Sequence, residues 1–444
     1  MLNRGNEACA VIKKHIDNGD IIRIISHNDS DGISAAGVIA TGIKEEGGQF
    51  HATIIPRLKS DVIKEVQREN YNLFVFSDMG SAFIDEINHF NKDVVIADHH
   101  QPSDAQSNDN IIHVNPHLFG IDGSKHLSGS GSSYLAIRNL NRQHLAILAL
   151  VGAIGDMQYN NGFTGVNKLI LEDAISSGHL EVFESLKIAS KDQESLFKSI
   201  AYTLNPPLKG LTGSFEESTG FLEKIGVSYG IKFSDLEGEE QDALKDALIN
   251  INPEIFGEVF YVAKEEAALR NLEDFSSILD ACGKNKKYGL ALSIALGERG
   301  QALDSGVKQL NTYRNQLIKG FDWIRREGAI ENEYIQSVYS EDKHLKLIIG
   351  TIAGVGLSIG LFNPEKPVIG ISRFQKDLKI SARTTRKMVN KGVNLSKAMN
   401  DASLNFGGQG GGHDIAAGAM IPYEAKDNFL NIVNDIIESQ LNNS

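Results

Sequence analysis

The chain has 444 residues, a net charge of −13, and 41% hydrophobic and 23% charged residues, which together predict a globular protein of two or three domains. The negative charge argues against a protein that simply coats nucleic acid, and no apolar run reaches the roughly 18 residues that a membrane helix needs. Two cysteines, Cys9 and Cys282, are too few for a disulfide framework, and the first residues lack a signal-peptide pattern, so we expect a cytoplasmic protein with no membrane partner.

The first third of the chain alternates short apolar runs with amphipathic stretches. The apolar runs are the predicted strands: 21–27, 51–56, 72–78, 93–100 and 110–115. The amphipathic stretches are the predicted helices: 33–46, 61–70 and 81–90. This alternation is typical of a parallel sheet flanked by helices, in which ligands bind beyond the carboxyl ends of the strands.

Helical spacing dominates the middle of the chain, and strand-like runs return near its end. Residues 302–327 predict a long helix of the kind that often connects two lobes. The later predicted strands are 334–340, 345–350, 366–372 and 378–384. We therefore expect an α/β protein with four parts: an N-terminal catalytic domain (1–190), a mainly helical middle region (191–300), a connecting helix (301–330) and a smaller α/β substrate-binding domain (331–444).

A histidine and two aspartates follow the first predicted strand, in the segment SHNDSDG at 26–32. Two carboxylates about 4 Å apart repel by roughly 4 kcal/mol at an effective dielectric constant of 20. Protonation of one carboxylate or a bound cation relieves this repulsion. The imidazole of His27 beside Asp29 and Asp31 favours the cation, because imidazole is a metal ligand. On this motif alone, a polar loop that caps the next helix is the alternative.

The same kind of ending recurs at the next strands. One predicted strand ends in Asp78, and another ends in the sequence Asp98-His99-His100. Asp156 follows an apolar helix, where the helix dipole disfavours a negative charge. A single terminal aspartate is commonly a helix cap, but three strand ends that deliver Asp and His to one sheet edge indicate a metal site.

Six residues at these positions supply enough ligands for two divalent ions: His27, Asp29, Asp31, Asp78, His99 and Asp156. Mixed imidazole and carboxylate ligands without thiolate favour Mn²⁺ and also accept Mg²⁺. Two such ions roughly 3.5–4 Å apart are a standard device for cleaving phosphate esters.

The C-terminal part contains two further features. Between 366 and 397 nine basic residues stand against one acidic residue, Asp377, which indicates either a solvated face or a substrate groove. The segment 406–419 is rich in glycine, and glycines let backbone N–H groups approach an anion closely. A flexible loop is the alternative for this segment.

These motifs resemble a known family. HNDSDG, Asp78, the literal DHH at 98–100 and GDM around Asp156 are similar to the four motifs of the DHH phosphoesterases. GGGHDIAAGA at 410–419 resembles the GGGH motif of the associated DHHA1 domain. The segments 114–120, 127–134 and 268–283 resemble the archaeal RecJ-like exonucleases, including the GINS-associated nucleases.

The resemblance implies a role for each matching residue. His27, Asp29 and Asp31 are implied metal ligands, Asp78 bridges the two ions, and His99 with Asp156 completes the second site. His100 is implied to donate a hydrogen bond to the scissile phosphate. The implied clamp for the phosphate and terminal nucleotide consists of Arg383 and a turn formed by Gly410, Gly411, Gly412 and His413.

We therefore expect a two-metal exonuclease that degrades single-stranded DNA or RNA to mononucleotides in replication or repair. Its expected cofactors are two divalent ions, Mn²⁺ by preference and Mg²⁺ as the alternative. Two other functions stay open. One is a phosphodiesterase of short oligonucleotides, nucleoside bisphosphates or cyclic dinucleotides. The other is a replisome scaffold that binds the GINS complex, with the acidic middle region as a partner surface.

Overall fold

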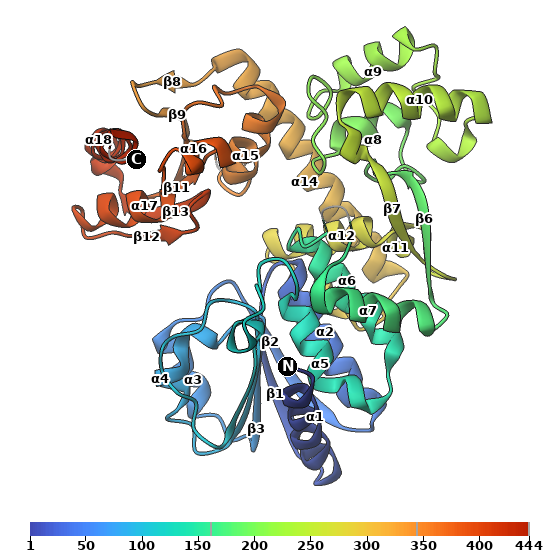
Figure 1. Cartoon of the computed structure of the whole chain (residues 1–444), viewed down its shortest axis with the longest axis vertical. Helices are drawn as coiled ribbons and strands as arrows, with labels where there is room; N and C mark the ends of the chain where they lie inside the picture. Colours follow the sequence, from blue (N-terminus) through green and yellow to red (C-terminus); the bar gives the residue numbers. More distant parts are fainter. Residues whose placement is uncertain (160–161, 343–344, 443–444) are drawn as a thin grey trace. The chain divides into compact units, whose positions relative to one another are not determined.

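The structure is a computed structural model that describes residues 1–159, 162–342 and 345–442 (Figure 1). The chain forms two compact units. The first unit comprises Met1–Ser185 and Gly257–Asn311, and the second comprises Leu186–Phe256 and Thr312–Ser444. The four domain limits drawn from the sequence stay a prediction. None of the helices in the described part of the chain combines the length and apolar character that crossing a bilayer requires.

The first unit contains a parallel sheet with the strand order β2-β1-β3-β4-β5. Its strands are β1 (Ile21–His27), β2 (Gln49–Ile55), β3 (Leu73–Ser77), β4 (Asp93–Ala97) and β5 (Ile111–Val114). The predicted parallel sheet is thus confirmed. Ser26 pairs with Ser77, Ser77 with Ala97, and Ala97 with Val114, so four strands end side by side. The strand order reverses between β1 and β3, which is where such sheets bind ligands.

Helices cover both faces of this sheet, which explains why β3 is buried along its whole length (Figure 1). One face carries α1 (Leu2–Asp17), α2 (Ser30–Glu45) and α5 (Gly129–Ile137). The other face carries α3 (Ser60–Gln67) and α4 (Ile84–Ile87). There Ile63 and Ile87 pack with Phe74 and Phe76 of β3 in one apolar core.

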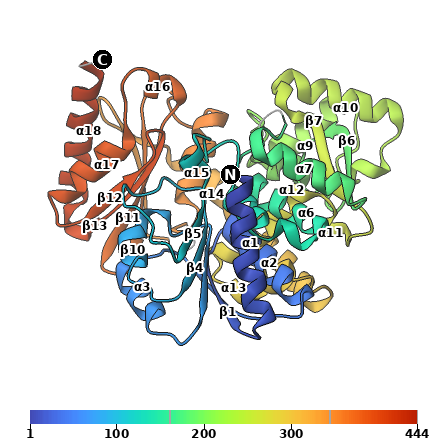
Figure 2. The ribbon, with the colours of Figure 1, turned by 60° about the horizontal axis from the view of Figure 1, so that its bottom comes forward.

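The first unit also contains four longer helices and a short one. They are α6 (Ala146–Gly155), α7 (Gly165–Ser176), α11 (Ala267–Arg270), α12 (Leu272–Lys284) and α13 (Tyr288–Ala295). Helix α12 packs against α6 and α2 (Figure 2). Ser276 Oγ of α12 lies 2.8 Å from Ser30 Oγ. A Cβ atom on Gly283 would lie 1.8 Å from the carbonyl oxygen of Asn28, so only glycine permits this close approach. Helix α12 therefore supports the HNDSDG loop.

The middle of the chain adds a helical cluster and a strand pair. The helices are α8 (Leu196–Tyr202), α9 (Phe215–Lys224) and α10 (Gly238–Ile251). Their core contains Leu196, Ile200, Leu222, Leu244 and Leu248. The strands β6 (Leu180–Leu186) and β7 (Phe256–Val262) form a two-stranded sheet. Neither strand is predicted from the sequence, because acidic residues within both runs weaken the apolar signal.

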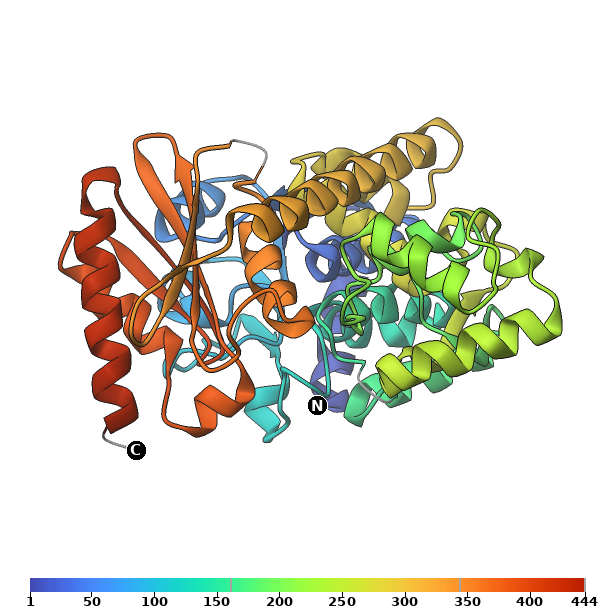
Figure 3. The ribbon, with the colours of Figure 1, turned by 90° about the horizontal axis from the view of Figure 1, so that it is seen from above.

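Helix α14 (Gln301–Glu327) is a single uninterrupted helix, as predicted (Figure 3). The C-terminal mixed sheet has the order β12-β13-β11-β10-β9-β8. Its strands are β8 (Ile330–Glu331), β9 (Gln336–Ser340), β10 (Val368–Phe374), β11 (Asp377–Arg383), β12 (Gln409–Gly412) and β13 (Ala416–Pro422). Its helices are α15 (Ile349–Ile359), α16 (Arg386–Asn390), α17 (Leu395–Leu404) and α18 (Lys426–Asn442).

Two local predictions for this part are wrong. Residues 345–350 form no strand, since the chain turns there and enters α15. The apolar run continues into a segment whose buried residues Ile348, Ile352 and Gly356 recur every four residues, which is a helical period. Gly410 to Gly412 form strand β12 rather than a turn, and the turn lies between β12 and β13.

Candidate metal centre

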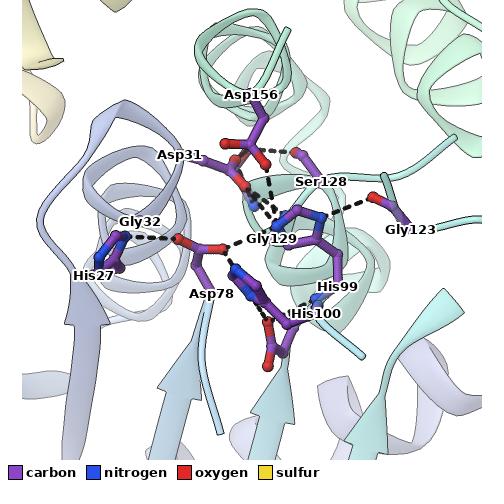
Figure 4. A network of polar contacts seen from close by, with 12 residues as sticks. His27, Asp31, Gly32, Asp78, His99, His100, Gly123, Ser128, Gly129 and Asp156 are labelled. Carbon is purple, nitrogen blue, oxygen red and sulfur yellow. Dashed lines mark hydrogen bonds and ion pairs between the residues drawn. The ribbon is translucent and has the colours of Figure 1, made fainter. Parts of the chain in front are cut away.

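The HNDSDG loop joins the end of β1 to the start of α2 (Figure 4). Asp29 caps α2, and its carboxylate accepts a 2.9 Å hydrogen bond from the N–H of Gly32. The other carboxylate oxygen of Asp29 lies 2.7 Å from Nδ1 of His27. Ser26 Oγ bonds to the carbonyl of Ser77 at 2.9 Å, which ties this loop to the end of β3.

Asp78 lies at the centre of the site, directly after β3. Its φ of 55° is left-handed, a conformation that aspartate tolerates better than most residues. The side chain is 2% exposed, with Oδ2 3.7 Å from Nδ1 of His27 and Oδ1 3.4 Å from Nε2 of His99. Within the described residues, Oδ1 accepts no hydrogen bond. A buried carboxylate oxygen without a donor is where a cation would fit.

Asp31 lies in the first turn of α2 and is held by the start of α5. Its carboxylate accepts hydrogen bonds from the N–H of Gly129 (2.6 Å), the N–H of Ser130 (3.0 Å) and the hydroxyl of Ser130. Ser128 caps α5 by accepting from the N–H of Gly131. No chemistry is predicted for this segment from the sequence, although a Ser-Gly-Ser-Gly run before an apolar helix is a capping signal.

His99 follows β4 with one ring nitrogen turned away from the carboxylates. Nδ1 donates to the carbonyl of Gly123 at 2.8 Å, a contact typical of histidines that bind a metal through the other nitrogen. Nε2 lies 3.1 Å from Asp156 Oδ2, 3.4 Å from Asp78 Oδ1 and 3.8 Å from Asp31 Oδ2 (Figure 4). One imidazole nitrogen thus faces three carboxylates.

Crowding of the carboxylates changes their protonation when no cation is present. Burial, together with the charges of Asp31 and Asp29, raises the pKa of Asp78 to about 7. Burial and the charge of Asp31 raise the pKa of Asp156 well above its ordinary value. A divalent cation favours the ionised form of both groups, so this donor set fits a metal.

Three overlapping groups of side chains bring their ligand atoms within 4.8 Å of one another. These groups are His27, Asp29 and Asp78; Asp78, His99 and His100; and Asp31, His99 and Asp156. The structure therefore brings all six predicted metal ligands together. Asp78 and His99 each belong to two groups, which is the geometry that a bridging residue needs. Their role as ligands stays a prediction.

Asp98 is a buried residue that positions His100. Its Oδ1 accepts from the backbone N–H of His99 at 2.7 Å and from Nδ1 of His100 at 2.8 Å, and its Oδ2 accepts from the N–H of Ser81 at 3.0 Å. Burial lowers the pKa of His100, but the bond to Asp98 and the nearby carboxylates outweigh this effect and raise it to about 9. Half-exposed His100 can therefore donate a hydrogen bond to an anion at neutral pH.

The buried histidine His113 contacts Ser81, and its burial should make the stability of the protein depend on pH. His113 is 3% exposed, its Nε2 lies 2.8 Å from Ser81 Oγ, and burial lowers its pKa to about 4. In the unfolded chain His113 has an ordinary pKa of about 6.5. Between about pH 6.5 and 4 it is therefore protonated in the unfolded chain but neutral in the native state. We expect this group to cost about 3 kcal/mol of stability at pH 4 and nothing above pH 7.

Urea unfolding of the wild type and the His113→Asn variant at pH 7 and pH 4 measures how much His113 contributes to the pH dependence of the free energy of unfolding. The wild type should lose about 3 kcal/mol relative to the variant on acidification. Equal losses in the two proteins would show that His113 does not titrate in this way.

Arg383, the predicted phosphate contact, ends β11 in the second unit. Its Nη1 donates to the carbonyl of Ala382 at 2.8 Å, and its guanidinium lies over two glycines of α15. A Cβ atom would lie 3.1 Å from Arg383 Nη2 if added to Gly350 and 3.6 Å from Arg383 Cδ if added to Gly354. Burial lowers the pKa of Arg383. No acidic side chain among the described residues pairs with it, which leaves the guanidinium available to an anion.

The glycines of β12 allow neighbouring backbone atoms to pack closely against this strand. A Cβ atom on Gly410 would lie 2.2 Å from the carbonyl oxygen of Met399, and one on Gly412 would lie 2.7 Å from that of Ala416. Exposed His413 donates its N–H to the carbonyl of Ala416 at 2.8 Å. Since Ala416 also pairs with Arg383, the predicted clamp residues lie at one end of this sheet.

The basic segment 366–397 is partly neutralised. Ion pairs join Lys366 to Glu331, Arg386 to Asp414, and both Lys387 and Lys391 to Glu365. At least four of the nine basic residues thus have an acidic partner in the same unit, and these exposed pairs contribute little stability. The composition alone therefore overstates the positive charge that this segment offers to a ligand.

Two family models and several known proteins match the chain. The N-terminal domain of the DHH family matches residues 21–152, and the DHHA1 domain matches residues 348–439. The uncharacterized protein MJ0831 of Methanocaldococcus jannaschii is 35% identical over 437 residues, which cover 97% of this chain and 96% of that protein.

Solved structures with the same fold include RecJ and CDC45. RecJ from Thermus thermophilus, solved in complex with Mn²⁺, matches with a TM-score of 0.62 and 16% identity over 98% of this chain. The chain spans about half of that RecJ, with 55% of its length covered. CDC45 from Entamoeba histolytica matches with a TM-score of 0.69 and 11% identity, over 98% of this chain and 99% of that one. The chain belongs to the DHH family and carries a DHHA1 domain.

Proposed function

We propose that the protein is a metal-dependent exonuclease that hydrolyses single-stranded DNA or RNA to mononucleotides. The observation that carries this proposal is the set of three overlapping His and Asp groups at the carboxyl edge of the parallel sheet. Membership of the DHH family supports a phosphoester hydrolase, and the fold shared with the exonuclease RecJ supports a nucleic-acid substrate.

Each residue of the centre has a proposed role. His27, Asp29 and Asp78 would hold one divalent ion, Asp31, His99 and Asp156 would hold the other, and Asp78 would be shared between them. When bound, the ions would polarise a phosphoryl oxygen and lower the pKa of a water molecule. The nitrogen and oxygen donors suit Mn²⁺ and accept Mg²⁺. His100, protonated and held by Asp98, donates a hydrogen bond to a phosphate oxygen.

Arg383 provides the second proposed contact with the substrate, because its partly buried guanidinium has no acidic partner among the described residues. Arg383→Ala should raise KM for a single strand by about tenfold or more, since charge-assisted bonds to phosphate contribute about 1.5–3 kcal/mol, while kcat should change little. Arg383→Lys should recover part of the loss, because it keeps the charge without the planar fork. Steady-state kinetics on a labelled strand measures both constants, and an effect on kcat alone would exclude the binding role.

A replisome scaffold that binds the GINS complex is the second candidate. The fold match with CDC45, over 99% of that chain, favours it. The intact set of His and Asp residues favours catalysis instead. A scaffold role in addition to catalysis is compatible with both observations.

The test is a nuclease assay with Mn²⁺ on 5′- and 3′-labelled single strands of DNA and RNA, beside a dinucleotide and a cyclic dinucleotide. Stepwise release of mononucleotides from long strands is the expected result, and the labels report the direction. Cleavage of the short substrates alone would assign the protein to the small-nucleotide phosphodiesterases. Metal binding without cleavage of any substrate would favour the scaffold.

A further inference from the structure

The second unit contains a cavity that has no place in the proposed chemistry. Its volume is about 670 Å³, within the range of pockets that hold small molecules. Helix α14 lines one side, and Ser340 at the end of β9, with Asp342 and Leu345, lines the other. The lining residues are Lys319, Asp322, Trp323, Arg325, Arg326, Ser340, Asp342 and Leu345.

The cavity contains the chain's one tryptophan between two cations. Lys319 precedes Trp323 by four residues and Arg326 follows it by three, so helical geometry places all three on one face of α14. Trp323 is half-buried, whereas Lys319 and Arg326 are exposed. An indole between two cations is the arrangement that proteins use to stack a base and hold the phosphates beside it.

The other two charged α14 residues in the lining, Asp322 and Arg325, pair with each other and not with Lys319 or Arg326. Arg325 pairs with Asp322 at 3.1 Å and donates to the carbonyls of Gly213 (2.8 Å) and Thr212 (3.2 Å). The guanidinium of Arg325 is therefore bound within the protein, and its positive charge offsets the negative charge of Asp322. Neither Lys319 nor Arg326 forms an ion pair with any described residue. Asp342 is the one other acid among the described lining residues, so this lining is locally positive in a chain of charge −13.

We propose that this cavity binds one nucleotide unit of a single-stranded nucleic acid, with the base on Trp323 and the flanking phosphates on Lys319 and Arg326. The choice of nucleic acid as the ligand rests on the proposed function. Neither Arg383 nor any residue of Gly410–His413 lines this cavity, so the site is distinct from the predicted clamp. Stacking on an indole is independent of sequence, which is what an enzyme that degrades any strand needs.

Tryptophan fluorescence measures this binding directly, because the chain has one tryptophan. The protein is titrated with a twelve-residue oligothymidylate in EDTA, so that no hydrolysis interferes. We expect saturable quenching in the wild type. The Lys319→Ala/Arg326→Ala variant keeps the fluorophore and should show a salt dependence that is shallower by about 0.7 in log–log slope for each lost contact. Lys209→Ala/Lys224→Ala, which removes two exposed lysines outside the cavity, is the charge-matched control.

Trp323→Ala and Trp323→Phe are compared by the anisotropy of a fluorescein-labelled strand. The alanine variant should bind about tenfold more weakly, and the phenylalanine variant, which can still stack, should recover most of the affinity. Normal affinity in both Trp323→Ala and the double variant would overturn the assignment. Equal quenching by a polyglutamate peptide would also overturn it, in favour of an acidic protein partner.

The same variants separate this inference from the proposed function. Hydrolysis of a long strand by Trp323→Ala with an unchanged KM would refute the cavity as a strand site and leave the exonuclease standing. Quenching by the oligonucleotide in a protein that cleaves no strand would support the cavity and refute the exonuclease.

Discussion

Asp78→Asn should abolish hydrolysis without unfolding the protein. Asparagine is close in shape to aspartate and tolerates the left-handed φ of 55° at this position, so the backbone should stay in place. The Asp78→Asn substitution removes the negative charge of a residue that belongs to two of the candidate metal-binding groups. Because a catalytic ion contributes several kcal/mol to the transition state, we expect a loss of roughly 10³-fold or more in kcat.

The melting temperature with and without Mn²⁺ gives a second measurement on the same variant. Ion binding should stabilise the wild type by about 2.7 kcal/mol at a hundredfold excess over Kd, and the variant should lose this effect. The metal-free variant should be at least as stable as the metal-free wild type at pH 8, because it lacks a buried carboxylate that Asp31 and Asp29 repel. Asp85→Asn, at an exposed aspartate of α4, is the control. Full activity in Asp78→Asn would exclude the two-metal assignment.

Gly129→Ala should disable the site although it removes no ligand. A Cβ atom on Gly129 would lie 2.3 Å from Asp78 Oδ1, a separation that forces either Asp78 or α5 to move. Movement of α5 would also disturb the N–H groups that hold Asp31. Since a displacement of about 1 Å can cost roughly 10²-fold in rate, we expect at least that loss, with a destabilisation of about 1–3 kcal/mol from overpacking.

The matched control is Gly220→Ala on the exposed side of α9, where an added Cβ meets no atom within 4 Å. It should be fully active and more stable by up to about 1 kcal/mol, because alanine is the better helix former. Calorimetric titration with Mn²⁺ shows whether Gly129→Ala loses the ion itself. Wild-type affinity and activity in that variant would mean that Gly129 does not limit the position of Asp78.

The sequence predicted the N-terminal sheet well because its strands are buried on both faces and read as nearly continuous apolar runs. It also predicted which residues would meet, since parallel strands bring their carboxyl ends to one edge. It did not predict that Gly123 would hold His99 or that the start of α5 would hold Asp31. Those contacts come from loops and helix ends whose position depends on tertiary packing, which no local pattern records.

Residues 345–350 show where prediction from a local sequence pattern fails. A six-residue apolar run has no periodicity long enough to separate a strand from the start of a buried helix. The helical period becomes visible only when the run is read together with the following ten residues. Length, rather than composition, would have corrected this prediction.

The support that α12 gives to the HNDSDG loop has a consequence for synthesis on the ribosome. All six candidate ligands lie within the first 156 residues, yet Ser276 and Gly283 contact Ser30 and Asn28 across 246 and 255 positions of the chain. The nascent chain therefore carries every ligand long before the loop that presents three of them can be fixed. Contacts of such long range form slowly. The metal centre is then among the last parts of the first unit to mature, although its residues are among the first to be made.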